Sequence, residues 1–343
     1  MNKTLYIRTE VNRITATGHM MRMLSVATAA RKMGCEAVFI VAEEGSMALP
    51  QSKRFEVICL NHTWDDFDGE IPLMQQLIAQ RQIEYLLIDS YFVTANYMEA
   101  VNALTKTAYV DDLHERIWPC SVLINYAVYS DLFDYKKEYP GKKLLLGCEY
   151  CPLSEIYEEL PPKEIRKEPK QVLVVTGGGD EFHFMKRFLT QIRTSRRLTN
   201  IDFRCICGKF HVDLAELEEM ARTMENVTVL SQLPNLKDAI LDADVVITAG
   251  GTTLYEIACC RTPALSFSLA DNQLYNVEGF GEQGYIPYLG DVRESMDFEQ
   301  VLSHLEQLLE DYEKRKNYSK RLGQLVDGKG ASRLVRDFLN LIE

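Results

Sequence analysis

The sequence of 343 residues contains no long hydrophobic run and no basic tract. No window approaches the ~20 apolar residues that span a bilayer, and the first apolar stretch, residues 5–7, is too short for a signal peptide. We therefore expect a cytoplasmic protein without membrane insertion. Acidic residues outnumber basic ones by 50 to 38, which gives a formal net charge of −12. Such a surface repels phosphate backbones, and basic doublets such as Lys142-Lys143 do not offset it, so no nucleic-acid partner is expected.

The chain also lacks the patterns of a disulfide framework, a zinc ribbon and a serine hydrolase. Its nine cysteines are an odd number, several lie within apolar runs, and they are interpreted as reduced thiols. Cys148-x-x-Cys151 and Cys205-x-Cys207 do not make the two Cys-x-x-Cys knuckles of a zinc ribbon. The five histidines other than His19 share no metal-ligand spacing, and no Gly-x-Ser-x-Gly elbow occurs. We expect no bound metal and no cofactor.

What the sequence does contain is a regular alternation of short apolar runs with amphipathic helical stretches. The expected strands are residues 5–8, 36–42, 55–60, 85–90, 108–110, 122–125 and 143–146, followed by 171–176, 203–207, 227–230, 244–248 and 264–268. The clearest helical patterns are residues 18–33, 71–81, 298–312 and 331–342. Strands and helices that alternate at this spacing predict parallel sheets covered on both faces. The expected fold class is α/β, with two Rossmann-like domains facing across a cleft.

The alternation is interrupted once, between Glu158 and Pro169. Three prolines and a dense mix of charges there predict a linker at 158–170. The linker separates an N-terminal domain, 1–157, from a C-terminal domain, 171–328, and the C-terminal helix 329–343 is expected to pack back on the N-terminal domain. In such sheets ligands lie at the carboxyl ends of strands, beside helix N-termini. Functional residues are therefore expected in the turns that follow strands.

The first such turn leads into Thr17-Gly18-His19, with Arg22 one helical turn further on. Gly18 permits close backbone approach, and the free N–H groups of a helix that begins there favour negative charge. The helix dipole is expected to lower the pKa of His19 and keep its ring neutral. A neutral imidazole can accept a proton from water. The alternative is a histidine that only caps or packs in the turn.

The strongest pattern is in the second half, where a buried strand ends in Gly250-Gly251 and Thr252-Thr253 begins the next helix. Backbone N–H groups and threonine hydroxyls at a helix N-terminus form a cradle for a diphosphate. Glu256, one turn further along, can hydrogen-bond a ribose diol. Capping of the helix by one of the threonines is the alternative, and it is compatible with phosphate binding.

Two further turns of the second half carry polar or glycine-rich sequences. Residues 177–180, Gly-Gly-Gly-Asp, follow the first strand of this half. They are typical of a flexible loop or a tight turn, or leave room for a bulky ligand near Gly178. Asp271-Asn272-Gln273 follows the strand at 264–268, and amide and carboxylate heads suit sugar hydroxyl and acetamido groups. An Asp271 N-cap would explain that residue but not Asn272 or Gln273.

Taken in order, these segments resemble one known family. They are Thr17-Gly18-His19 with Arg22, Asp89-Ser90-Tyr91, Asp111-Asp112, Gly177-Gly178-Gly179-Asp180, Ala249-Gly250-Gly251-Thr252-Thr253-Leu254-Tyr255-Glu256 and Asp271-Asn272-Gln273. The chain resembles the UDP-sugar hydrolases of pseudaminic acid biosynthesis, which act on UDP-2,4-diacetamido-2,4,6-trideoxy-β-L-altropyranose. These are similar in turn to the GlcNAc transferase of peptidoglycan synthesis, with a GT-B fold and no metal requirement. The family usually has aspartate at Glu10 and glycine at Ala16.

The resemblance implies roles for individual residues. His19 matches the histidine proposed to activate water, and Tyr91 matches an active-site tyrosine. The positions implied for phosphate and ribose are Gly251, Thr253 and Glu256, and those implied for the sugar are Asn272 and Gln273. We group Gly18, Arg22, Gly178, Gly250 and Thr252 with them as expected substrate or UDP contacts.

The sequence thus predicts an enzyme that hydrolyses a UDP-linked (di)acetamido deoxy sugar to UDP and free sugar. Water would attack the anomeric carbon, with C–O cleavage and inversion, in nonulosonic acid or surface-polysaccharide biosynthesis such as flagellin glycosylation. Two alternatives stay open: a GT-B glycosyltransferase that uses a UDP-sugar donor, and a catalytically idle nucleotide-sugar binding protein. The expected partner is the UDP-sugar substrate alone, and we expect a monomer or weak dimer.

Overall fold

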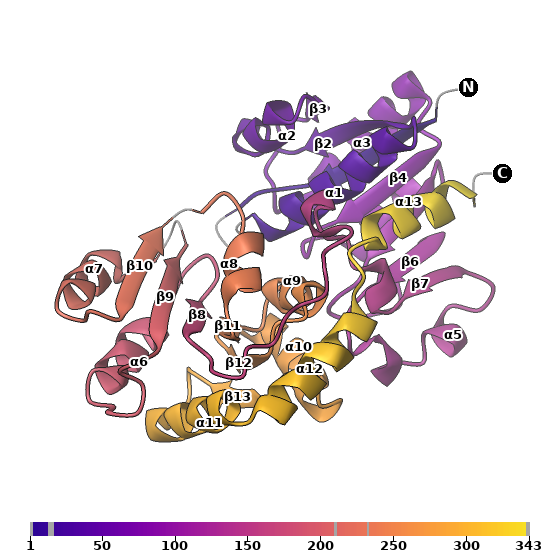
Figure 1. Ribbon diagram of the computed structural model, residues 1–343. Helices are drawn as coiled ribbons and strands as arrows, with labels where there is room; N and C mark the ends of the chain where they lie inside the picture. Colours follow the sequence, from indigo (N-terminus) through magenta and orange to yellow (C-terminus); the bar gives the residue numbers. More distant parts are fainter. Residues whose placement is uncertain (1–2, 13–16, 209–210, 232, 341–343) are drawn as a thin grey trace. The chain divides into compact units, whose positions relative to one another are not determined.

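The computed structural model describes residues 3–12, 17–208, 211–231 and 233–340, without the side chains of 339 and 340. The chain folds into two compact units (Figure 1). The first unit comprises Met1–Glu158 together with Gly328–Glu343, and the second comprises Glu159–Asp327. Each unit is built on one parallel sheet with helices on its faces, which confirms the predicted α/β class.

The sheet of the first unit has seven strands in the order β3-β2-β1-β4-β5-β6-β7. The strands are β1 Thr4–Thr9, β2 Glu36–Val41, β3 Glu56–Cys59, β4 Tyr85–Asp89, β5 Lys106–Val110, β6 Val122–Asn125 and β7 Lys143–Leu146. All neighbouring strands run parallel. The central strands are continuous apolar runs because helices cover both faces of the sheet.

The helices of the first unit pack on this sheet. They are α1 Gly18–Lys32, α2 Ala48–Ser52, α3 Phe67–Arg81, α4 Ala95–Asn102, α5 Tyr135–Glu138 and α13 Gly330–Asn340, with 3-10 turns η1 Glu44–Ser46, η2 Ser130–Leu132, η3 Cys148–Tyr150 and η4 Glu155–Tyr157. Met74 of α3 and Tyr97 of α4 are fully buried with Ile40, Leu86 and Ile88 of the sheet in one core cluster. Burial of such side chains is worth about 1.5–3 kcal/mol each.

The C-terminal helix α13 belongs to the first unit, where it packs against α1 and η3 (Figure 1). Leu334, Val335 and Phe338 are buried on it, and the rings of Phe338 and Tyr85 meet edge to face with centroids 6.0 Å apart. At the start of α13, a Cβ on Gly330 would lie 2.0 Å from the carbonyl oxygen of Cys151. The helix can approach η3 this closely only because residue 330 has no side chain.

The sheet of the second unit has six strands in the order β10-β9-β8-β11-β12-β13, and all neighbours are parallel. The strands are β8 Gln171–Val175, β9 Asp202–Cys207, β10 Val227–Ser231, β11 Val245–Ala249, β12 Ala264–Ser268 and β13 Tyr288–Asp291. The helices are α6 Phe184–Ile192, α7 Leu214–Arg222, α8 Lys237–Asp242, α9 Thr253–Cys260, α10 Leu274–Glu282, α11 Phe298–Glu310 and α12 Tyr312–Leu325, with the 3-10 turn η5 Asp271–Gln273. The edge strand β13 and the helix α12 were not predicted from the sequence.

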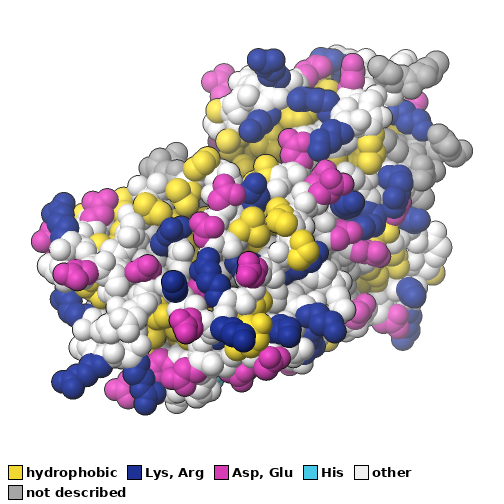
Figure 2. Space-filling model, in the orientation of Figure 1, with side chains coloured by type: hydrophobic (Ala, Val, Ile, Leu, Met, Phe, Trp, Pro, Cys, Tyr) yellow, Lys and Arg dark blue, Asp and Glu magenta, His cyan; other side chains and the backbone are white. Residues whose placement is uncertain are grey.

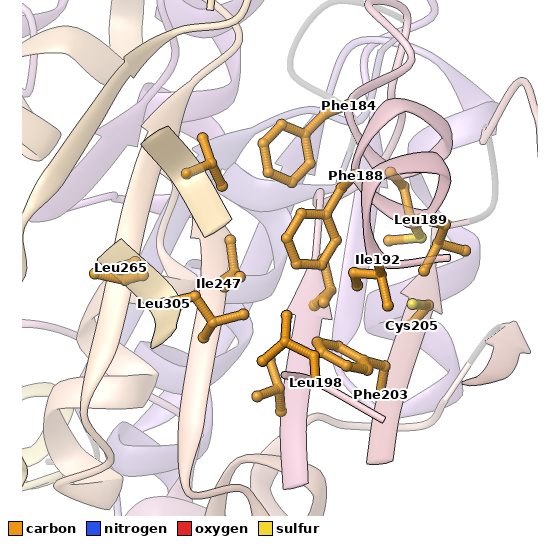
Figure 3. Packing of buried hydrophobic residues seen from close by; sticks show 14 of the residues in the cluster. Phe184, Phe188, Leu189, Ile192, Leu198, Phe203, Cys205, Ile247, Leu265 and Leu305 are labelled. Carbon is orange, nitrogen blue, oxygen red and sulfur yellow. The ribbon is translucent and has the colours of Figure 1, made fainter. Parts of the chain in front are cut away.

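The core of the second unit forms between the sheet and helices α6 and α11. Figure 3 shows Phe184 and Phe188 of α6 directed toward the sheet residue Ile247, with Leu305 of α11 close by. The rings of Phe184 and Phe267 stack with their centroids 3.7 Å apart. This packing fixes the start of α6, and with it the glycine-rich turn that precedes that helix.

The proline-rich segment expected as a linker is bound to the second unit over most of its length. The ammonium group of Lys163 donates to the carbonyl oxygens of Leu241 and of Ala243, the latter at 2.7 Å. Arg166 pairs with Asp244 at 2.9 Å. Arg315 of α12 is fully buried and donates to the carbonyl oxygens of residues 166 and 167. Specific hydrogen bonds therefore hold this segment, although its composition offers no apolar face.

The surface carries charges of both signs, and Figure 2 shows acidic and basic side chains interspersed over the face that it presents. Within the described residues, no helix is long and apolar enough to cross a membrane.

In each sheet the strand order reverses beside the first strand of the unit. The reversal lies between β1 and β4 in the first unit and between β8 and β11 in the second. Open parallel sheets bind ligands at the carboxyl ends of the strands at such points. The ends of these four strands and the segments that follow them contain Glu10 and His19, Asp89–Tyr91, 177–180 and 250–253. These are the segments from which a functional site must be built.

Candidate functional site

The reversal point of the first unit is occupied by five polar side chains, which we call the histidine cluster: His19, Arg22, Asp89, Tyr91 and Asp112. His19 is the second residue of α1, and Asp89 is the last residue of β4. The ring nitrogen Nδ1 of His19 lies 3.0 Å from a carboxylate oxygen of Asp89. Both side chains are almost completely buried. The structure thus pairs the predicted catalytic histidine with a carboxylate that sequence reasoning had not assigned a role.

Arg22 also binds the Asp89 carboxylate, through both of its oxygens. Its Nε donates to Oδ2 of Asp89 at 2.6 Å, and a second guanidinium N–H donates to Oδ1. The remaining guanidinium nitrogen donates to Oδ2 of Asp112 at 2.7 Å and to the hydroxyl of Tyr126 at the same distance. A two-pronged guanidinium–carboxylate pair has a fixed geometry. Arg22 thus contacts Asp89, Asp112 and Tyr126. A direct contact of Arg22 with substrate stays a prediction.

The electrostatics of His19 differ from the sequence expectation. Burial disfavours its imidazolium form, but the charge of Asp89, its hydrogen bond with the ring and the charge of Asp112 together raise the pKa of His19 above its ordinary value. Burial likewise opposes ionisation of Asp89, yet the Arg22 guanidinium and His19 hold the pKa of Asp89 well below its usual range. The prediction that the helix dipole lowers the pKa of His19 is wrong, because an ion-pair partner at 3.0 Å acts more strongly than partial charges at a helix end.

The Asp89 contact also fixes which ring nitrogen of His19 can act as a base. An ionised carboxylate can only accept hydrogen bonds. Nδ1 must therefore carry the hydrogen that it donates to Asp89. The lone pair is then on Nε2, the nitrogen directed away from Asp89. A histidine held in this tautomer is suited to accept a proton from a hydroxyl group or a water molecule.

Tyr91 lies against the histidine and is not itself placed as a base. Its ring meets the His19 ring edge to face, with centroids 4.4 Å apart, and its hydroxyl donates to Oδ2 of Asp112 at 3.1 Å. Burial, together with the Asp112 carboxylate, raises the pKa of Tyr91 well above its ordinary value. Tyr91 therefore keeps its proton, and its observed contacts are those of a residue that orients His19.

A second buried charge cluster adjoins the histidine cluster at the end of β1. Arg8 forms a two-pronged pair with Glu70 of α3, at 2.9 and 2.7 Å, and also donates to Glu10 at 3.1 Å. All three side chains are completely buried. The hydroxyl of Tyr97 donates to Glu70 at 3.0 Å. Nothing in the sequence pattern indicated this cluster, because Glu70 lies 62 positions from Arg8 along the chain.

In the second unit, the start of α9 is open to a ligand. Neither Thr252 nor Thr253 caps the helix with its side chain, so the capping alternative is not what the structure uses. Among the described residues, no hydrogen-bond partner is found for these two hydroxyls or for the two backbone N–H groups. A Cβ at Gly251 would meet nothing within 4 Å. Free N–H groups and hydroxyls beside open space are the elements of an anion site.

Gly250 and Gln273 are brought together by close packing. A Cβ at Gly250 would lie 2.4 Å from the Val277 side chain and 3.0 Å from the Cβ of Gln273, so a glycine is required there. The amide oxygen of Gln273 accepts from the backbone N–H of Leu269 at 2.9 Å. This bond leaves the amide NH₂ of Gln273 as the group that can face a ligand. Asn272 is exposed beside it.

The turn that carries Asn272 and Gln273 is held by Arg293, which sequence reasoning missed. Arg293 contacts Asp271 at 2.6 Å and Asp291 of β13 at 2.7 Å. Asp271 does not cap a helix with its side chain, so the N-cap alternative for this residue is not what the structure uses. No local sequence signal could have identified Arg293, because it follows a strand that the apolar pattern did not predict.

The turn at 177–180 is a tight strand-to-helix turn. Gly177 has φ of +85°, and Asp180 accepts from the backbone N–H groups of Phe184 and Met185 at 2.9 and 2.8 Å. A Cβ at Gly208 would lie 2.3 Å from the carbonyl oxygen of Gly177. Gly178 is exposed at the tip of the turn, and its contact with substrate stays a prediction.

The aspartates of the two Asp-x-Asp sequences, a pattern that can hold a metal ion on a diphosphate, accept hydrogen bonds from the protein. Two Asp-x-Asp sequences occur, at 66–68 and 242–244. Asp66 caps α3, Asp68 accepts from Thr94, and Asp244 accepts from two backbone N–H groups. Over the described ranges, no group of three or more His, Cys, Asp or Glu side chains is arranged to hold a metal ion.

Residues 172–332 match the glycosyltransferase family 28 C-terminal domain. The chain is 21% identical, over 329 residues and 95% of each protein, to the spore coat polysaccharide biosynthesis protein SpsG of Bacillus subtilis (strain 168). It is also 21% identical, over 267 residues, to the uncharacterized protein MJ1062 of Methanocaldococcus jannaschii, covering 72% of this chain and 52% of that protein.

Among solved structures, the chain is similar to MurG of Acinetobacter baumannii, with a TM-score of 0.72, 13% identity and coverage of 97% of this chain and 98% of that one. It is also similar to the glycotransferase of kitacinnamycin, with a TM-score of 0.73, 14% identity and complete coverage of both chains. The fold is therefore GT-B, as predicted.

Proposed function

We propose that this protein is an enzyme of polysaccharide biosynthesis that acts on a UDP-sugar. The second unit would bind UDP at the start of α9, and the first unit would supply His19 as the general base. The observation that carries the proposal is the His19–Asp89–Arg22 arrangement, since it is an oriented base of the kind that anomeric chemistry requires. The match of residues 172–332 to a glycosyltransferase domain supports the nucleotide-sugar part.

The reaction we propose is hydrolysis, to UDP and free sugar. His19 takes a proton from water at Nε2 while the water oxygen attacks the anomeric carbon, and the bond from that carbon to the UDP oxygen breaks. Asp89 stabilises the imidazolium that forms. The negative charge on the departing diphosphate is met by the N–H groups and hydroxyls of Thr252 and Thr253. Attack opposite the leaving group inverts the configuration. We propose a (di)acetamido deoxy sugar as the substrate class on the resemblance to pseudaminic acid hydrolases.

Glycosyl transfer is the second candidate, and the likeness to MurG and to a family 28 domain favours it. The same base would then deprotonate an acceptor hydroxyl in place of water. Reaction in ¹⁸O-labelled water distinguishes the two. Hydrolysis places one label on C1 of the released sugar and none in UDP, whereas transfer leaves both unlabelled. Label in UDP would contradict cleavage between the anomeric carbon and the UDP oxygen. If no UDP-sugar releases UDP, with or without acceptors, the protein binds a nucleotide sugar without catalysis.

UDP binding at α9 is tested by replacing Glu256 with alanine. Glu256 lies one turn into the helix, beyond Thr252 and Thr253, and as a carboxylate it can accept both ribose hydroxyls. The variant should bind UDP more weakly by about 1.5–3 kcal/mol, the range for hydrogen bonds to a charged group. Calorimetry with UDP measures the change. The matched control is Glu278→Ala, at an exposed position of α10, and equal affinities of the two variants would remove Glu256 from the site.

A further inference from the structure

The second unit contains a basic pocket, which we call the α12 pocket, away from the start of α9. It has a volume of about 390 Å³ and is formed by the segment that leads into the unit, the residue that follows α9 and one side of α12. The helices α9 and α12 pack against each other (Figure 1). The polar and charged residues that line the pocket are Lys163, Arg261, Lys316, Ser319, Lys320 and Gln324. Four of these are cationic and none is acidic, in a chain whose formal net charge is −12.

The protein does not neutralise the cations that α9 and α12 contribute to this pocket. Among the described residues, no ion pair or hydrogen bond involves the side chain of Arg261 or of Lys320. Lys316 has the ring of Tyr312 as its neighbour, with 5.9 Å between Nζ and the ring centroid. A Cβ at Gly323 would lie 2.8 Å from Cδ of Arg261, so the arginine side chain lies directly against α12. Unpaired positive charges therefore converge on one hollow.

Lys163 reaches the same pocket from the proline-rich segment. Its ammonium group donates to two backbone carbonyl groups, which leaves its third N–H. The Asp244 carboxylate, whose charge acts on Lys163, is already paired with Arg166 at 2.9 Å. Burial lowers the pKa of Lys163 to about 8, although the charge of Asp244 opposes this change. An anion in the pocket would favour the charged form of this lysine.

Ser319 supplies a feature that is independent of the charges. The residue lines the pocket and is only 6% exposed. Within the part of the chain that the structure describes, its hydroxyl has no hydrogen-bond partner. A helical serine commonly donates to the carbonyl group four residues before it, as Ser25 does in α1. A nearly buried hydroxyl without a partner indicates a ligand group that hydrogen-bonds to it.

A phosphate group is the ligand chemistry that fits these donors. It carries up to two negative charges and three strong acceptor oxygens, so it can bind several cations and a hydroxyl together. A carboxylate carries one charge and matches the four cations less well. Phosphate could come from a soluble ligand or from a lipid headgroup. A soluble ligand is favoured, because Ser319 is too deeply placed for a flat lipid surface and only Pro162 and Ile165 supply apolar side chains to the lining.

We propose that the α12 pocket binds the phosphate group of a small soluble ligand through its cations and the Ser319 hydroxyl. The site is separate from the proposed UDP site, because α9 has eight residues and rises about 1.5 Å per residue, which places Thr253 and Arg261 about 12 Å apart. A phosphate ligand and UDP can then bind together. The proposal goes beyond the proposed function and does not rest on it.

The test is calorimetric titration of the full-length chain with inorganic phosphate and with glucose 6-phosphate. Saturating UDP is present, so that the anion site proposed at the start of α9 is filled. The wild type should bind at least one of the two compounds at a single site. Lys320→Gln should weaken this binding about tenfold or more, the range for a hydrogen bond to a charged group, and Ser319→Ala should also weaken it. The control Lys314→Gln, at an exposed position of α12 outside the pocket, should bind as the wild type does.

The outcomes separate this proposal from the proposed function. No saturable binding of either compound, or equal affinities in the wild type, Lys320→Gln and Ser319→Ala, would overturn the phosphate site whether or not UDP binds. Binding to phosphatidylglycerol vesicles without binding of either soluble compound would overturn the assignment to a soluble ligand. If the chain binds no UDP, the proposed function fails, whereas phosphate binding that is weakened in both variants would still support the α12 pocket.

Discussion

Replacing His19 with alanine should lower turnover by about 10²–10⁴, the contribution of a positioned general base. The affinity for UDP should change little, because in the proposed function the base acts on the attacking nucleophile and the second unit binds UDP. The measurement is steady-state release of UDP together with calorimetric binding of UDP. A loss in kcat at constant UDP affinity indicates an interaction made in the transition state.

The matched control is His304→Ala, since His304 is an exposed histidine on α11 whose Nδ1 lies 2.8 Å from the carbonyl oxygen of Gln300 in the same helix. This variant should retain wild-type turnover. A His19 variant with wild-type turnover would exclude His19 as the base. Parallel loss of UDP binding and turnover would assign His19 to substrate contact or structure, and Asp111 would then be the next candidate base.

Replacing Asp89 with asparagine should reduce turnover by a comparable factor, about 10²–10⁴, although Asp89 touches no reacting atom. Asparagine can donate to Nδ1 of His19 and so place the proton on the wrong nitrogen, an effect that costs up to about 10⁴ in a serine-protease triad. It also removes the charge that stabilises the imidazolium. Asp89 is thus a positioning residue, and its loss should appear mainly in kcat.

The pH profile separates this role from a structural one. His19 must be neutral to act as a base, so activity is lost as pH falls through its pKa. In the wild type that pKa is raised by Asp89. Without the carboxylate, burial and the Arg22 guanidinium dominate and lower it, so the acid limb of the profile should move to lower pH.

Because removing one partner of a buried ion pair is destabilising by about 3–5 kcal/mol, the profile is recorded below the melting temperature of the variant. Asp65→Asn, at an exposed position, is the control. An unshifted acid limb in Asp89→Asn would show that Asp89 does not act through His19.

The local patterns were sufficient to predict most of the fold. Twelve strands of the two sheets lie at the predicted apolar runs, since strands buried on both faces must be continuously apolar. The edge strand β13 was missed because its residues are only half-buried and include Gly290 with φ of +116°. The helix α12 was missed because its buried positions include Arg315 and Ser319, which produce no apolar periodicity.

The residues of the candidate site also divide into those that local sequence predicts and those that it does not. Gly250–Thr253 and His19 could be predicted because each lies in a strand-to-helix turn, and such turns can be recognised from the local sequence. The pairing of His19 with Asp89 depends on the strand order, which puts β4 beside β1 with Thr9 opposite Asp89. Glu70 and Arg293 depend on contacts between distant segments, and no spacing along the chain predicts those.

The return of α13 to the first unit has a consequence for synthesis. On the ribosome, residues 159–327 are contiguous and can fold as soon as they emerge, whereas the first unit also needs α13, which is made after them. Until then the face of α1 that α13 covers, on the same helix that begins with Gly18 and His19, has no neighbour. The second unit can therefore be completed before the first, and a product truncated before Gly330 would lack the helix that packs against α1, which carries His19.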